Sequence, residues 1–239
     1  MSVLFKRVNG VNRFVCGASL IHPRMVITAA HCITSEGLGE LRVRSGEWDL
    51  ANTKEPLEHQ ERGVARLVIH QEYNNESLIS DIALIVLDAP MDINPTVDTV
   101  CLAEPHAAFA KINTSACVVT GWGKNQFEGG KHQKILREVT LPIVERGECQ
   151  RRLRETRLGK HFVLHESFIC AGGSPEEDSC EGDGGGPLVC PILTDPNRYI
   201  QVGIVSWGIG CANTNPGVYV SVPNYFSWIA TTMIDALKV

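Results

Sequence analysis

The chain has 239 residues, of which 44% are hydrophobic and 21% charged, and its formal net charge is −5. This composition is typical of a folded globular protein and excludes disorder over most of the length. The negative charge gives no general attraction to nucleic acid or anionic membrane, and no apolar run approaches the roughly 20 residues of a membrane-spanning helix. We therefore expect neither nucleic acid nor membrane as a partner.

Nine cysteines in a chain of this length indicate an oxidising compartment, so we expect a secreted, extracellular protein. Two glycosylation sequons, at Asn75 and Asn113, agree with secretion. Lys6 and Arg7 interrupt any apolar run at the start, so we expect a signal peptide to lie upstream of this chain.

Short apolar runs separated by turn residues indicate an all-β protein. The predicted strands are residues 24–28, 41–44, 65–70, 82–87, 116–120, 139–144, 188–193, 201–207 and 218–222. Near the end of the chain, apolar residues recur at three- and four-residue steps, which predicts an amphipathic helix over about 224–238. Residues 145–154 are predicted to form a second, short helix.

Three motifs in chain order carry the chemistry: His31 in Thr-Ala-Ala-His-Cys, Asp81 in Asp-Ile-Ala-Leu, and the run Gly-Asp-Gly-Gly-Gly-Pro at 182–187. Together they resemble the chymotrypsin-like serine proteases, whose last motif reads Gly-Asp-Ser-Gly-Gly-Pro. The resemblance implies that His31 is the general base, that Asp81 orients it, and that Gly184 occupies the nucleophile position. Glycine has no oxygen for acyl transfer, so the sequence describes a protease scaffold without its reactive group.

The resemblance covers residues 1–239 and implies an all-β fold of two six-stranded β-barrels followed by a C-terminal helix. We expect the barrels to span roughly 1–105 and 106–225. By the same resemblance, Asp178, Gly208 and Gly217 form a pocket for Lys or Arg side chains, and the amides of Gly182 and Gly184 form the oxyanion hole.

Cysteine spacing alone gives no connectivity, but the resemblance implies four pairs. They are Cys16–Cys32, Cys117–Cys190, Cys149–Cys170 and Cys180–Cys211. Cys101 remains, and the resemblance implies an interdomain disulfide to a segment upstream of this chain.

Lys6-Arg7-Val8-Asn9-Gly10 resembles a tryptic activation site, but it lies too close to Cys16 for that role. We interpret residues 8–10 as a turn, with Lys6 and Arg7 in a hairpin loop. In the family a new amino terminus pairs with the aspartate matched by Asp183. We expect Asp183 to have no such partner within this chain.

Residues 43–49, 94–101 and 156–160 resemble insect clip-domain serine protease homologs, a group that includes masquerade-like proteins and prophenoloxidase-activating cofactors and often has Gly at the nucleophile position. A clip domain is not present in this sequence. The resemblance implies no required cofactor. The acidic loop at 47–61 overlaps a region where some relatives bind a structural calcium, although a solvated loop is the simpler interpretation.

Two functions remain open. The first is a non-catalytic homolog that acts as a binding cofactor or adaptor in an extracellular cascade, such as prophenoloxidase activation in melanisation and innate immunity. Its partners would be prophenoloxidase or cascade proteases. The second is a trypsin-like endopeptidase inactivated by a Ser-to-Gly replacement at Gly184, which the preserved His31, Asp81 and Asp178 favour.

The stretch 150–165, which we expect to be a loop, carries five basic residues: Arg151, Arg152, Arg154, Arg157 and Lys160. It is either a solvated basic face or a docking site for an acidic partner.

Overall fold

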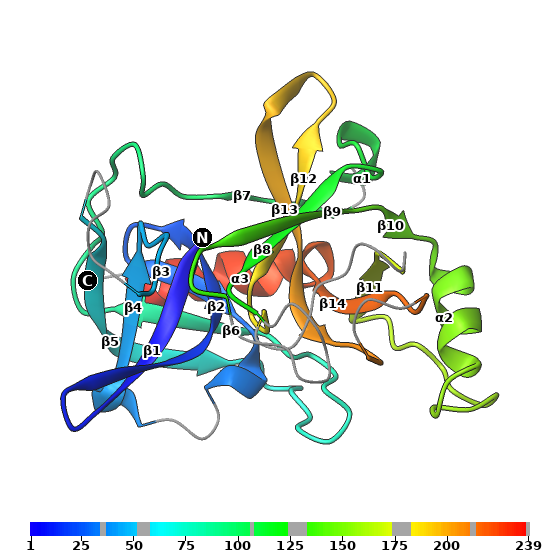
Figure 1. Cartoon of the computed structure of the whole chain (residues 1–239), viewed down its shortest axis with the longest axis horizontal. Helices are drawn as coiled ribbons and strands as arrows, with labels where there is room; N and C mark the ends of the chain where they lie inside the picture. Colours follow the sequence, from blue (N-terminus) through cyan, green and yellow to red (C-terminus); the bar gives the residue numbers. More distant parts are fainter. Residues whose placement is uncertain are drawn as a thin grey trace.

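The computed structural model describes residues 1–33, 37–51, 58–105, 108–123, 133–173, 183–210 and 214–237. The fold consists mainly of two β-sheets that lie side by side, followed by a C-terminal helix (Figure 1). The first sheet is a closed barrel, and the second is an eight-stranded half-barrel. The expected all-β, chymotrypsin-like architecture is confirmed, although the second sheet is not a closed six-stranded barrel in the described residues.

The first barrel brings together the motifs that contain His31 and Asp81. Its strands, in order around the barrel, are β1 (Ser2–Val8), β2 (Val11–His22), β3 (Met25–Thr28), β6 (Ala83–Leu87), β5 (Gln60–Ile69) and β4 (Leu41–Ser45). In β4, Leu41 and Val43 are buried while Arg42 and Arg44 are not, the alternation expected when one strand face lines a core. All five residues of β6 are buried, because both of its faces are covered.

A tight hairpin joins β1 to β2. Asn9 and Gly10 form the two-residue connection with φ of 52° and 79°, which suits a turn that needs positive φ at both positions. The turn predicted at 8–10 is therefore present. Lys6 and Arg7, expected in the hairpin loop, instead lie in β1, with Lys6 opposite Arg13. The short turn leaves those residues free to continue the strand pairing.

The second sheet positions Gly184 and two residues of the expected pocket, Gly208 and Gly217. Its strands in order are β10 (Ile143–Val144), β11 (Phe168–Ala171), β14 (Gly217–Ser221), β13 (Asp195–Trp207), β12 (Pro187–Ile192), β8 (Cys117–Gly121) and β9 (Arg137–Leu141). A short strand, β7 (Cys101–Leu102), pairs with β13 in parallel, so the chain joins this sheet before the expected boundary at 105. The β12–β13 hairpin projects beyond the rest of the sheet (Figure 1).

The two longer helices lie apart from each other (Figure 1). α2 (Arg146–Arg154) matches the helix predicted at 145–154, and Glu145 caps it by accepting a 3.0 Å hydrogen bond from the Glu148 amide. α3 (Val222–Leu237) is the predicted C-terminal helix and begins two residues earlier than expected. It ends beside the first barrel, whereas α2 lies at the far edge of the second sheet (Figure 1).

Three short helical segments complete the described elements: η1 (Ala30–Cys32), η2 (Leu38–Glu40) and α1 (Ala108–Lys111). Among the described helices, none has the length and apolar character needed to cross a membrane.

Candidate functional site

His31 and Asp81 meet where the first barrel contacts the second sheet. His31 lies in η1, directly after β3, and Asp81 precedes β6, the strand that pairs with β3. The His31 ring nitrogen Nδ1 lies 2.7 Å from Asp81 Oδ2, and the His31 amide donates to Asp81 Oδ1 at 2.8 Å. Both carboxylate oxygens are engaged, so the imidazole is held in one orientation.

Ser206 supplies a further contact that the sequence did not reveal. Its hydroxyl donates to Asp81 Oδ2 at 2.6 Å, and the Asp81 side chain is fully buried. Ser206 lies in β13 and Asp81 lies 125 positions earlier, just before β6, so no local spacing indicates that they touch. The hydrogen-bonding capacity of this buried carboxylate is therefore satisfied by several donors.

Gly184 faces the Nε2 side of the His31 ring, where Cys32 Sγ also lies 3.6 Å from Nε2. A Cβ atom added to Gly184 would lie 3.1 Å from His31 Nε2 and 3.7 Å from Cys16 Sγ. The φ angle of Gly184 is outside the left-handed region, and its carbonyl accepts from the Gly17 amide at 2.8 Å. Neither space nor backbone conformation therefore requires glycine here.

The next two glycines, Gly185 and Gly186, are packed too tightly to carry a side chain. Gly185 has φ of 76°, and a Cβ there would lie 2.3 Å from Thr28 Oγ1 and 2.5 Å from the Gly17 carbonyl. At Gly186 a Cβ would lie 2.9 Å from the Asp183 carbonyl. Packing requires glycine at both of these positions but not at 184.

Asp183 is buried in a notch made by glycines. Its Oδ1 accepts a 2.8 Å hydrogen bond from the Gly123 amide. A Cβ on Gly121 would lie 1.9 Å from the same oxygen, so only a glycine leaves room for this carboxylate. Asp183 thus has a main-chain partner in the Gly-Trp-Gly motif at 121–123.

The expected pocket is described only in part. Gly208 follows β13 and Gly217 begins β14, and the pairing of Trp207 with Val218 brings the two glycines to the same end of this strand pair. Asp178 and Gly182, and with them the expected carboxylate and half of the expected oxyanion hole, lie outside the described residues.

The basic stretch at 150–165 begins as helix rather than loop, because residues 150–154 belong to α2. Arg151 forms ion pairs with Glu148 at 2.8 Å and Glu155 at 2.6 Å. Arg152 pairs with Glu148 at 2.6 Å. Hydrogen bonds from Arg151 and Arg152 lower the pKa of Glu148 from 4.5 to about 2.

These ion pairs reduce the unpaired positive charge of the stretch 150–165. Arg154 directs its Nε to the Phe162 carbonyl at 2.8 Å. Arg157 and Lys160 are exposed, and no ion pair involves either of them within the described part of the chain. The free positive charge therefore gathers after the helix rather than along it.

Three disulfides are formed: Cys16–Cys32, Cys117–Cys190 and Cys149–Cys170. They are three of the four pairs that we expected. Cys180 and Cys211 lie outside the described residues. Cys101 is exposed and forms no disulfide with any described residue.

Both sequon asparagines are exposed. Asn75 accepts a hydrogen bond from the Tyr73 hydroxyl at 3.0 Å, and Asn113 accepts one from the Ser115 amide at 3.1 Å.

The suggested calcium loop begins at a buried carboxylate, Glu47, that already has an arginine and a histidine as neighbours. Glu47 Oε2 lies 2.7 Å from Arg44 Nη1 and 3.3 Å from His59 Nδ1. The described residues thus fit an internal ion pair better than a calcium site, while residues 52–57 lie outside the description. Cys16, His31 and Cys32 also lie close together, but both cysteines are in a disulfide and have no thiolate to offer a metal.

Comparison with known proteins agrees with this geometry. Residues 2–229 match the family described as "Trypsin". The chain belongs to the trypsin family. Its relatives include insect clip-domain protease homologs.

Three relatives illustrate the similarity. "Phenoloxidase-activating factor 2" of Galleria mellonella is 50% identical over 221 residues, which cover 92% of this chain and 72% of that protein. An "Inactive CLIP domain-containing serine protease" of Anopheles gambiae is 42% identical over 223 residues, 93% of this chain and 57% of that protein. "Protein masquerade" of Drosophila melanogaster is 38% identical over 225 residues, 93% of this chain and 21% of that protein.

Proposed function

We propose that this chain is a non-catalytic serine protease homolog that acts by binding, as a cofactor or adaptor in an extracellular proteolytic cascade. One observation carries the proposal: a Cβ on Gly184 would face His31 Nε2 at 3.1 Å, but the residue has no side chain. His31 can accept a proton, Asp81 can hold its tautomer, and no hydroxyl or thiol stands at the position where a proton would be taken.

In this proposal His31 and Asp81 are the former general base and its orienting acid. The amides of Gly182 and Gly184 are the former oxyanion hole, and Asp178, Gly208 and Gly217 are the pocket. A domain of this kind influences a cascade only by changing where other proteins sit or which conformation they hold. We assign it a retained cleft that binds basic side chains without cleaving the peptide.

The cascade that we propose is prophenoloxidase activation, with prophenoloxidase or a cascade protease as the partner. A relative named phenoloxidase-activating factor, 50% identical, supports this choice, as do relatives named as inactive proteases. The three disulfides support a secreted, extracellular protein.

Cys101 has a separate role in this proposal. It is exposed on β7, and we assign it a disulfide to an upstream segment, which would stay attached after cleavage between the two. Non-reducing peptide mapping of the full-length protein tests this. Recovery of Cys101 as an alkylated free thiol would exclude the tether.

The cofactor function is tested by adding the full-length protein, processed by its upstream protease, to proenzyme and activating protease. Phenoloxidase activity should rise. A heat-inactivated sample of the same protein is the control. Equal phenoloxidase activity with and without the native protein would exclude the cofactor function.

The alternative is an endopeptidase whose serine was replaced by glycine. The intact His31–Asp81–Ser206 contacts favour it, as does a backbone at Gly184 that does not require glycine. A Gly184→Ser variant separates the two: tryptic turnover near that of an ordinary enzyme supports the alternative, and little turnover supports a homolog that has lost more than its nucleophile.

A further inference from the structure

A groove of about 380 Å³ lies beside one edge of the second sheet, where β10 and β11 meet the start of α2. None of the described residues that line it belongs to the site around His31 and Gly184. Its volume is at the small end of the roughly 300–1,000 Å³ range of ligand pockets, so it fits one or two bulky side chains rather than a large ligand.

Apolar side chains make up most of the groove. Ile143 and Ile169 pack against the core of the second sheet but are only partly buried, so they leave apolar surface open to the groove. Phe109, in α1, lines the groove from another segment of the chain and keeps 40% of its surface exposed. Apolar surface of this kind is stabilised when a partner covers it.

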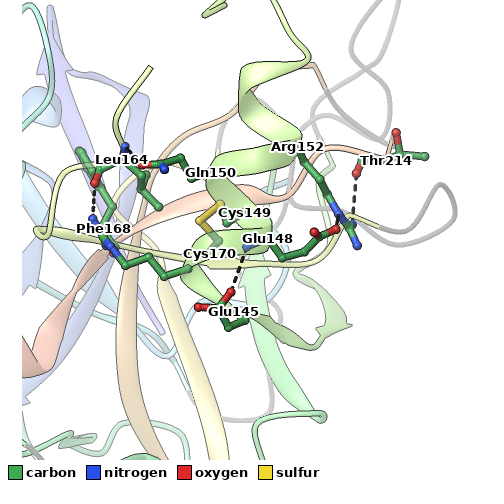
Figure 2. Close-up of a disulfide and its surroundings, with 10 residues drawn as sticks. Glu145, Glu148, Cys149, Gln150, Arg152, Leu164, Phe168, Cys170 and Thr214 are labelled. Atoms are coloured by element: carbon green, nitrogen blue, oxygen red, sulfur yellow. Dashed lines mark hydrogen bonds and ion pairs between the residues drawn. A yellow bond between two sulfur atoms is a disulfide. The ribbon is translucent and has the colours of Figure 1, made fainter. Parts of the chain in front are cut away.

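The wall of the groove beside α2 is held in place by a disulfide and an arginine. The Cys149–Cys170 bond joins α2 to β11, and Figure 2 shows Leu164 and Phe168 to one side of it. Arg146 donates to the carbonyls of both residues, at 3.3 Å to that of Phe168. A partner would therefore meet a preformed surface and would not have to order it on binding.

The charges of the groove indicate which partner fits. Two carboxylates, those of Glu145 and Glu166, line it against one guanidinium, that of Arg146. Hydrogen bonds from main-chain amides, first that of Gly147, lower the pKa of Glu145 and keep it charged. Glu166 is exposed, its carbonyl accepts from the Asn224 amide at 2.6 Å, and its carboxylate has no hydrogen bond or ion pair within the described residues. The surplus of acid favours a basic residue beside the apolar anchor of a partner.

We propose that this groove is a docking site for a segment of a partner protein in which one or two bulky apolar side chains stand beside a lysine or arginine. The apolar side chains contact Phe109, Ile143 and Ile169, and the basic group pairs with Glu166. The inference goes beyond the proposed function, because it concerns a surface outside the former catalytic site and names the chemistry of the segment that binds there.

Fluorescence anisotropy with short labelled peptides and the unmodified protein tests this. Each peptide has a lysine on either side of two central residues drawn from Leu, Phe, Tyr and Trp. We expect saturable binding by members of this set, weakened at least about tenfold when both central residues are serine. Replacing the lysines with glutamates should also weaken binding, and added salt should weaken binding of the lysine peptides, because their exposed charges are screened.

Variants of the protein show whether the peptides bind in the groove. Phe109→Ser should weaken binding about tenfold, and Phe109→Leu should restore part of the loss, because it keeps an apolar wall. Glu166→Lys should weaken binding several-fold. The matched controls are Val11→Ser and Glu76→Lys, which change polarity and charge in the same direction at exposed positions in and between strands of the first barrel, and they should leave binding unchanged.

Several results would overturn the inference. One is that no peptide of the set binds. Another is that Phe109→Ser and Glu166→Lys bind as well as the unmodified protein, or no worse than the two controls, which would place the peptides on another surface. A third is self-association of the unmodified protein in sedimentation that is lost in Phe109→Ser, which would show that a second copy of the chain occupies the groove. The peptide assay contains no cascade protein, so its outcome is independent of the phenoloxidase test.

Discussion

A Cβ atom on Gly184 would lie 3.1 Å from Nε2 of His31, while on its other side the same imidazole lies 2.7 Å from Asp81. The base and its orienting acid are thus in place beside a position that has no side chain. Purified protein should therefore neither cleave tryptic peptides nor become labelled by a fluorophosphonate. An oxyanion hole and binding alone leave only about 10³–10⁴-fold acceleration over water in enzymes that lack triad members. Stoichiometric labelling that disappears when one serine is substituted would contradict this.

The glycine run should respond unequally to alanine. Gly184→Ala should change the free energy of unfolding by less than about 1 kcal/mol, because the added Cβ meets only one close atom. Gly185→Ala should cost more than about 3 kcal/mol, since its φ is 76° and its Cβ would collide with Thr28 and the Gly17 carbonyl. Urea denaturation of the two variants gives the comparison. Equal stabilities would mean that the backbone at 185 adapts freely.

Asp81 should matter for stability even without catalysis. Asp81→Ala removes a buried carboxylate that accepts from the His31 amide, the His31 ring and the Ser206 hydroxyl, and should cost about 2–4 kcal/mol. His31→Ala leaves the amide and Ser206 in contact with Asp81 and should cost less than about 1.5 kcal/mol. Calorimetry of both variants tests the difference. Such a structural role explains why the pair persists beside a missing nucleophile, and a negligible effect of Asp81→Ala would remove that explanation.

Local sequence motifs predicted many of the residues of this site, but they could not predict contacts between residues that are distant in the sequence. His31, Asp81 and Gly184 stand in recognisable short sequences, whereas the Ser206–Asp81 bond joins residues 125 positions apart. The turn between β1 and β2 was predicted, but the two strands were not, because residues 2–5 are all buried and show no alternation. The stretch 150–165 was expected to be a loop, but it begins in α2, where Arg151 pairs with its helical neighbours at three and four positions, Glu148 and Glu155.

His70 should make the protein less stable in mild acid. Its ring is buried against Tyr225 and Trp228, with centroids 4.9 Å away in both cases, and the Tyr225 hydroxyl bonds to Ser80 beside Asp81. Burial lowers the pKa of His70, and nearby Glu72 opposes this only in part.

The direction of this pH dependence follows from the difference in the His70 pKa between the folded and the unfolded chain. Below the ordinary histidine value of about 6.5 the unfolded chain takes up a proton that the folded ring resists, so stability is lost as the pH falls from neutral. In denaturation from pH 7 to pH 5, His70→Gln should lose less stability than the unmodified protein. An identical pH dependence would assign the effect to other groups.

The final prediction concerns the docking of an acidic partner. Arg151 and Arg152 are paired with Glu148, and Arg151 also with Glu155, so reversing their charges would disrupt α2 as well as any interface. Arg157 and Lys160 are exposed just after the helix, and we expect them to supply the attraction. Arg157→Glu combined with Lys160→Glu should lower the association rate and the stimulation of phenoloxidase several-fold at physiological salt.

The matched control is Arg66→Glu with Arg198→Glu, which changes the net charge equally at exposed positions on β5 and β13. Added salt should weaken binding of the unmodified protein, because exposed charges are screened beyond about 8–10 Å, and should matter less for the double variant at 157 and 160. Equal loss in both double variants would mean that net charge alone steers association. No loss in either, with stimulation intact, would place the partner on another surface while leaving the cofactor function untouched.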